Sequence, residues 1–185
     1  NVYVVEADYG NIKMTGSILR VVGETGIGTK GDIIIDCEEI DVNATLNTAI
    51  VTNTASGNVT LTADKMRITA TRERYKNSYN PDLPAAYENQ WKYGSVVSGN
   101  GVTISSQDAV ITGPTPVFAD AEVRLRGNIQ LNASGYEAGI KCFSGSVSLA
   151  GDISIYFDED SDRDEEVVFG IYSNGSITAT GTGLY

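Results

Sequence analysis

Apolar residues recur along this chain in small groups, two residues apart within a group, with glycine, asparagine, aspartate and serine between the groups. The clearest copies of the pattern run from Ile27 to Val42 and from Ile140 to Ile155. A period of two is typical of β-strands that bury one face. Because each unit is too small to bury its apolar residues alone, the repetition predicts units that stack on their neighbours, as in a β-solenoid.

One position in the middle apolar group of each unit serves as a marker of the repeat. The markers lie 21, 26, 43, 21, 24 and 30 residues apart by subtraction of their numbers, which predicts about seven coils with two oversized gaps. We expect the five inner markers to stack in one buried ladder. The seven markers are Met14, Ile35, Leu61, Ile104, Leu125, Leu149 and Ala179.

Two further apolar groups accompany each marker, so the pattern predicts three short strands per coil and almost no α-helix. Variable coil length with insertions at corners favours a right-handed parallel β-helix over the left-handed form, which keeps a strict six-residue rhythm. An antiparallel sandwich or jelly roll also has many short strands, but its strands need not share a sequence pattern as these repeats do. The group after the marker begins at Ile18, Ile40, Met66, Ala109, Ile129, Ile153 and Leu184, and the third group is placed at Ile27, Ile50, Val97, Val117, Ile140 and Ile171.

Length and charge narrow the class of protein further. The 185 residues predict a single solenoid domain over 1–185 with inserts at 71–94 and 157–168, and the end in mid-repeat suggests a fragment of a larger protein. A net charge of −11 opposes binding to nucleic acid and to anionic membrane surfaces. No run of 18 apolar residues occurs, so we expect no membrane insertion.

The sequence of residues 170–181 resembles the repeats of large surface proteins of Gram-positive and Bacteroidetes bacteria. It reads Gly-Ile-Tyr-Ser-Asn-Gly-Ser-Ile-Thr-Ala-Thr-Gly. In architecture, residues 10–185 resemble the pectin-lyase-like right-handed β-helices. This resemblance implies an extracellular protein, secreted or at the cell surface. Such groups include polysaccharide lyases, carbohydrate-binding modules and adhesin stalks, so the resemblance specifies no activity.

The chain contains no histidine, which removes the most common general base and zinc ligand. A β-helix lyase needs calcium-binding carboxylates facing a basic residue, and the nearest strand positions are Arg124 and Arg126. Alternating arginines on an outward strand face are more typical of a solvated strand. We therefore expect no enzymatic activity, with a calcium-dependent polysaccharide lyase as the least favoured alternative.

The insert at 71–94 is rich in aromatic residues that could contact a sugar ring. The opposing interpretation is that these rings cover the flank of the solenoid, as long loops often do. The candidate ligand-binding residues are Tyr75, Tyr79, Tyr87, Trp91 and Tyr93.

The second insert carries an acidic run from Asp158 to Glu166, in which alternate aspartates resemble the start of a calcium loop. The match is imperfect, because Arg163 and Phe169 stand where an EF-hand has Gly and Glu. A solvated acidic loop is the favoured interpretation. The alternative is a loop that binds calcium, the one cofactor that the sequence suggests. The candidate metal ligands are Asp158, Asp160, Asp162 and Asp164.

The repeat makes two predictions about positions far apart in the sequence. Both inserts follow the same strand of their coils, so they should leave from one corner of the rod, three coils apart, with Tyr136 and Glu137 between them. Cys37 and Cys142 lie four coils apart, about 19 Å along the axis, which is too far for a disulfide. Both thiols should therefore be unpaired.

Together these features predict a non-catalytic extracellular module for glycan binding or adhesion, with a polysaccharide or host glycan as partner. The alternative is a structural stalk or spacer without a ligand. The sequence does not specify the glycan or the oligomeric state.

Overall fold

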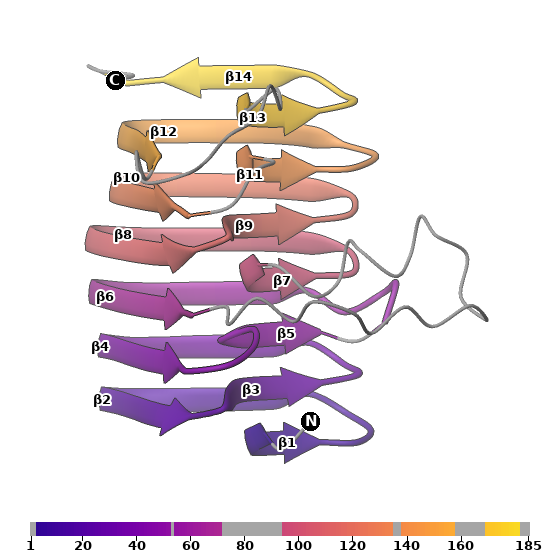
Figure 1. The fold of residues 1–185 in the computed structure, drawn as a ribbon, viewed down its shortest axis with the longest axis vertical. Coiled ribbons are helices and arrows are strands. Elements are labelled where there is room, and N and C mark those ends of the chain that lie inside the picture. Colours follow the sequence, from indigo (N-terminus) through magenta and orange to yellow (C-terminus); the bar gives the residue numbers. More distant parts are fainter. Residues whose placement is uncertain (1–2, 53, 72–93, 135–137, 158–168, 182–185) are drawn as a thin grey trace.

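The chain forms two parallel β-sheets of seven strands each, and the described residues contain no helix. The computed structural model describes residues 3–52, 54–71, 94–134, 138–157 and 169–181. Long and short strands alternate along the chain, and each kind stacks in its own sheet (Figure 1). The predicted all-β parallel solenoid is confirmed.

The long strands have 12 or 13 residues, except for the shorter last one, and the short strands have three to five. The sheet of long strands contains β2 (Ile12–Gly23), β4 (Ile33–Ala44), β6 (Val59–Ala70), β8 (Gly101–Gly113), β10 (Glu122–Ala133), β12 (Ser146–Phe157) and β14 (Ile177–Thr180). The sheet of short strands contains β1 (Tyr3–Ala7), β3 (Thr25–Thr29), β5 (Ile50–Thr52), β7 (Gly94–Ser98), β9 (Thr115–Ala119), β11 (Ala138–Cys142) and β13 (Phe169–Ser173).

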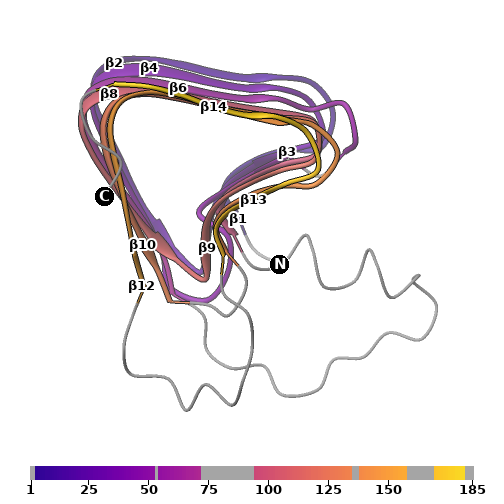
Figure 2. The same cartoon turned by 90° about the horizontal axis from the view of Figure 1, so that it is seen from above.

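Each coil has two strands, not the three short strands predicted from the sequence. Seen along the axis, a long strand bends and covers two sides of a triangle, and a short strand covers the third (Figure 2). The prediction failed because hydrogen bonding continues around the bend. Complete turns are slightly fewer than the seven predicted, since β1 and β14 are partial turns at the ends of the described rod.

The solenoid is right-handed. The chain rises from β1 to β14 as it runs from left to right in front and from right to left behind (Figure 1). This is the usual hand of a crossover between parallel strands of one sheet.

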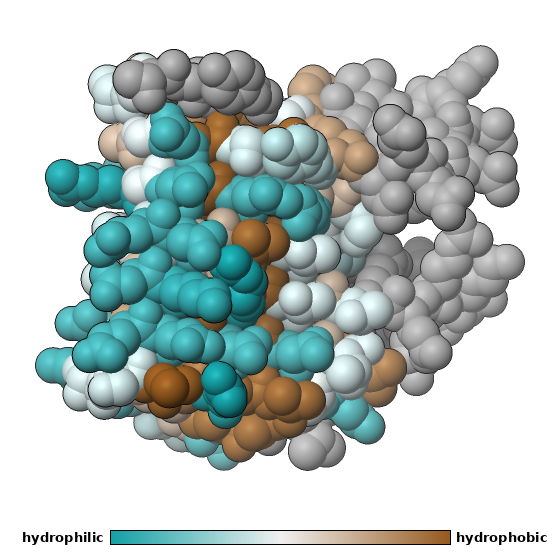
Figure 3. All heavy atoms as spheres, turned by 90° about the vertical axis from the view of Figure 1, so that its left-hand side faces the viewer, coloured by the Kyte–Doolittle hydropathy of each residue, from teal (hydrophilic) through white to brown (hydrophobic). Residues whose placement is uncertain are grey.

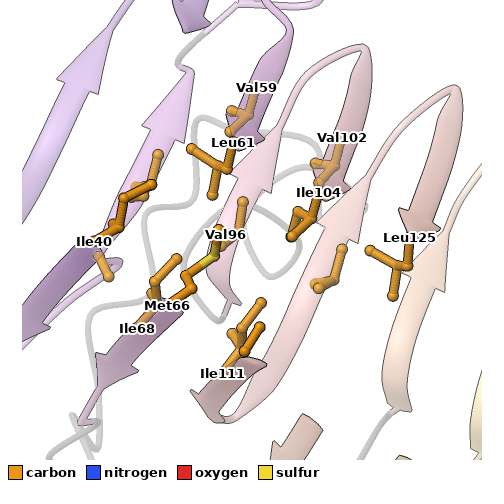
Figure 4. Packing of buried hydrophobic residues seen from close by; sticks show 14 of the residues in the cluster. Ile40, Val59, Leu61, Met66, Ile68, Val96, Val102, Ile104, Ile111 and Leu125 are labelled. Atoms are coloured by element: carbon orange, nitrogen blue, oxygen red, sulfur yellow. The ribbon is translucent and has the colours of Figure 1, made fainter. Parts of the chain in front are cut away.

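The predicted ladder of markers is confirmed residue by residue. Backbone pairing joins all seven markers in order, from Met14 through Ile35 and onward to Ala179. The five inner markers are buried, whereas Met14 is partly exposed and Ala179 is exposed. Leu61, Ile104 and Leu125 project to the same side of successive strands (Figure 4). One continuous aliphatic core therefore runs along the rod.

Two positions in the other apolar groups were predicted one residue away from their true place. Ile18 is 60% exposed, and its neighbour Leu19 pairs with Ile40 in the buried column. Val96, not Val97, pairs with Ile50 and Val117 in the inward column of the short strands. In both cases two adjacent apolar residues compete for one inward position, which the alternation alone cannot resolve.

Val97 belongs instead to a second hydrophobic cluster. It packs with Val51 and Phe118, separately from the main core. The short strands β3, β5, β7 and β9 are buried along their whole length, so no exposed side reveals which residues face inward.

Polar ladders add to the apolar stacking. Thr52, at the end of β5, is fully buried and donates from Oγ1 to the Gly57 carbonyl at 3.1 Å. The same oxygen accepts from the Gly99 N–H at 3.1 Å, so one hydroxyl links two coils. On the outer surface, Arg67 on β6 pairs with Asp108 on β8 at 3.0 Å. The side of the rod at the bend is largely hydrophilic (Figure 3).

Candidate functional site

The two predicted inserts leave the rod from the same corner. Each follows the end of a long strand, β6 for the insert predicted at 71–94 and β12 for the insert predicted at 157–168, although Phe157 still belongs to β12 and Gly94 already belongs to β7. Ala133 at the end of β10 pairs with both Gly113 of β8 and Phe157 of β12, and Thr69 of β6 pairs with Thr112 of β8. The strand ends therefore lie in one column, three coils apart, as predicted.

The residues proposed as ligands within these inserts lie outside the described residues. This holds for the aromatic candidates Tyr75, Tyr79, Tyr87, Trp91 and Tyr93, and for the acidic candidates Asp158, Asp160, Asp162 and Asp164. Their predicted roles stay predictions.

A pocket of about 220 Å³ lies on this corner. Thr112 on β8, Asn132 on β10 and Tyr156 on β12 occupy one column of the ladder, so three successive coils contribute to it. Adjacent coils are about 4.8 Å apart, which gives the column a length of about 10 Å. Ala133, Ser134 and Phe157 complete the lining, and none of the described residues that form it is charged.

Hydrogen bonds fix the polar centre of this corner pocket. Asn132 donates from Nδ2 to Thr112 Oγ1 at 3.2 Å and accepts at Oδ1 from Gln130 Nε2 at 2.9 Å. Beside it, the Tyr156 side chain is 55% exposed. The pocket thus combines an exposed aromatic ring with a preoriented amide and hydroxyl groups. Sequence reasoning missed it, because residues 20 and 24 positions apart become neighbours only through the exact pairing of strands.

A larger open groove of about 480 Å³ lies at the bend of the long strands, away from the corner pocket. Its small residues Gly16, Cys37, Ala63, Ser106 and Gly127 come from five successive strands. Polar side chains complete the lining: Asp36, Glu38, Thr62, Asp64, Ser105, Gln107 and Arg126. None of the described residues that line this groove is aromatic, which distinguishes it from the corner pocket.

A change in the shape of the bend accompanies the groove. Between Ser106 and Ala109 on β8 there are two residues, whereas between the paired positions Gly127 and Ile129 on β10 there is one. The shorter bend places Gly127 at a φ of 113°, a region that favours glycine. Arg126, predicted to be a solvated strand residue, is exposed at this point.

Both cysteines are free and buried, as predicted. Burial raises the pKa of the Cys37 thiol, and the negative charge of Asp36 raises it further. Burial is also the main cause of the raised pKa of Cys142, which lies on the other sheet. Since the thiolate is the nucleophile, the raised pKa lowers the reactivity of both side chains. They act as small core residues.

Within the described residues, no group of three or more His, Cys, Asp or Glu side chains could hold a metal ion. The described part of the chain also contains no helix long and apolar enough to cross a membrane.

Comparison of the chain with family models, curated proteins and solved structures finds no match in any of the three. The class of protein is therefore defined by the fold itself, a right-handed parallel β-solenoid.

Proposed function

We propose that this solenoid is a non-catalytic, extracellular module of a bacterial surface protein that binds glycan at the corner from which the inserts leave. The proposal rests mainly on the corner pocket, where Tyr156 stands next to the oriented amide of Asn132. Aromatic rings with a few convergent polar groups are typical of small-ligand sites. The described part of the lining carries no charged side chain, which favours neutral sugar units over charged ones.

The repeat architecture supports the same assignment. Coils at a spacing of about 4.8 Å align the outward side chains in columns, which suits a linear polymer lying along the rod. The aromatic residues of the 71–94 insert would extend the contact surface, because the insert follows β6 in the same column of strand ends. The likeness to β-helical surface proteins is consistent with a location at the cell surface.

A glycan array with Tyr156→Ala tests the proposal. We expect the unaltered protein to bind neutral polysaccharides, and Tyr156→Ala to weaken the best ligand about tenfold, which corresponds to about 1.4 kcal/mol. Tyr9→Ala is the matched control, because Tyr9 is 84% exposed in the first coil, far from the pocket. Titration calorimetry with the best array ligand would measure the change.

The competing function, a stalk without a ligand, predicts a silent array. Equal loss of binding in Tyr156→Ala and Tyr9→Ala would place the site elsewhere. Release of unsaturated sugar that absorbs in the ultraviolet would instead identify a polysaccharide lyase.

A further inference from the structure

The corner pocket is one part of a longer row of outward side chains. The same column of the ladder continues from the pocket to Thr69 on β6, Asn43 on β4 and Val22 on β2. At about 4.8 Å per coil the complete row is about 24 Å long, whereas the pocket spans about 10 Å of it. One residue from each of six successive long strands forms the row: Val22, Asn43, Thr69, Thr112, Asn132 and Tyr156.

No member of this row is charged, although the neighbouring outward column contains Arg20, Asp41 and Arg67. Both arginines form ion pairs on the side of the bend, away from the row. Arg20 pairs with Glu39 at 3.5 Å, and Arg67 pairs with Asp108 at 3.0 Å. A neutral ligand can therefore cover the row without removing water from a charged side chain of the row itself, which would cost free energy.

The polar members of the row keep hydrogen-bonding capacity for a ligand. Thr112 Oγ1 accepts from Asn132, so its O–H can still donate. Asn43 and Thr69 are partly exposed, and neither side chain makes a hydrogen bond to another described residue. Amide and hydroxyl groups both donate and accept, as the hydroxyl groups of a sugar do. The row thus offers polar contacts on four successive coils beside the aromatic ring of Tyr156.

We propose that the whole row is one elongated site, which binds a linear, neutral polysaccharide lengthwise. This site rests on the proposed function, because it contains the corner pocket, and it defines the ligand as a chain rather than a single sugar unit. Successive coils superpose when seen along the axis, so the row runs along the rod (Figure 2). A polymer of one repeated unit can therefore meet similar contacts at each coil.

The alternative is a site limited to the corner pocket, which holds only a short part of the glycan. The two alternatives differ in how the affinity depends on ligand length. A single pocket gains no contacts from sugar units beyond about 10 Å, although a longer chain offers it more positions to bind. The elongated site gains contacts at Thr69 and Asn43 as the chain grows.

Titration calorimetry with linear oligosaccharides of glucose, mannose or xylose of increasing length tests the elongated site. We expect the affinity for the preferred series to rise until the oligosaccharide spans about 24 Å and then to level off. Thr69→Ala and Asn43→Ala should each weaken binding of the longest oligosaccharide about three- to tenfold, as expected for loss of one hydrogen bond. Their effect on the shortest one should be smaller. Tyr156→Ala should weaken binding at both lengths.

Thr60→Ala is the matched control for Thr69→Ala. Thr60 lies on the same strand, β6, but in an outward column on the other side of the bend. The control should change the affinity at neither length. Circular dichroism checks that each variant is folded.

Equal affinity for short and long oligosaccharides would overturn the elongated site and leave glycan binding at the corner pocket intact. A gain with length that Thr69→Ala and Asn43→Ala do not reduce would also overturn it, because the gain would then come from the number of binding positions or from other residues. Absence of binding in all three series would contradict the elongated site and the proposed function together.

Discussion

Single buried hydroxyl groups hold the turns of this solenoid in place. Thr52 donates to the Gly57 carbonyl, and Ser98, at the end of a neighbouring short strand, donates to the same oxygen at 2.7 Å. Ser173 makes the equivalent bond to Gly145 at 2.7 Å. Cys142 ends its short strand in the same way, with its thiol directed at the Ser146 carbonyl at 3.6 Å. The column holds small side chains throughout, but Ala7 and Ala119 occupy it without a hydrogen-bond donor.

Thr52→Val should therefore lower the free energy of unfolding by about 1–3 kcal/mol, because the near-isosteric change leaves the buried Gly99 N–H without its acceptor. Urea denaturation measures the effect. Thr60→Val is the control, since Thr60 faces outward on β6 and should change stability by less than about 0.5 kcal/mol. Similar losses in both variants would contradict a specific role for the buried hydroxyl.

At the scale of the element, the bend of each long strand determines how the coil closes. Two glycines at the bend, Gly16 on β2 and Gly127 on β10, lie in different environments. A side chain at Gly127 would collide with the Ser106 carbonyl oxygen, whereas one at Gly16 would meet open space. The tighter bend of β10 therefore depends on glycine.

Gly127→Ala should destabilise the protein by at least about 2 kcal/mol, from the cost of a positive φ and the collision with the backbone. Gly16→Ala should change stability by no more than about 0.5 kcal/mol. Thermal and urea unfolding of the pair measure the contrast. Equal stability of the two variants would show that β10 can adopt the wider bend of β8.

For the whole molecule, the inserts are additions to a rod that can close without them. β2 connects to β3 through Glu24 alone, and β8 connects to β9 through Pro114 alone. The corner therefore needs no long segment to join a long strand to a short one. The backbones of β5 and β7 pair directly, although the aromatic insert lies between these strands in the sequence.

Deletion of residues 73–93 should leave a folded rod and weaken glycan binding, because it removes the aromatic residues of the insert. Circular dichroism and small-angle scattering would measure the fold, and calorimetry the affinity. Deletion of the acidic residues 159–167 of the other insert is the control and should preserve binding to neutral glycans. Unfolding of the first variant would show that the aromatic insert contributes to hydrophobic packing, as the alternative interpretation of the sequence holds.

The sequence by itself determined the solenoid, the order of its coils and the ladder of markers. Stacked coils bury one side of each strand, and this requirement leaves a visible period of two and a repeat of inward residues such as Ile35, Leu61 and Ile104. The same repeat correctly predicted the common corner of the inserts and the unpaired state of Cys37 and Cys142.

Only the tertiary structure decided which outward residues meet, because outward positions carry no apolar period. Thr112, Asn132 and Tyr156 form a pocket solely through the pairing of three strands. The bend was not visible in the sequence either. Two adjacent residues face outward there and break the alternation, so Ile18 was predicted at the inward position that Leu19 occupies.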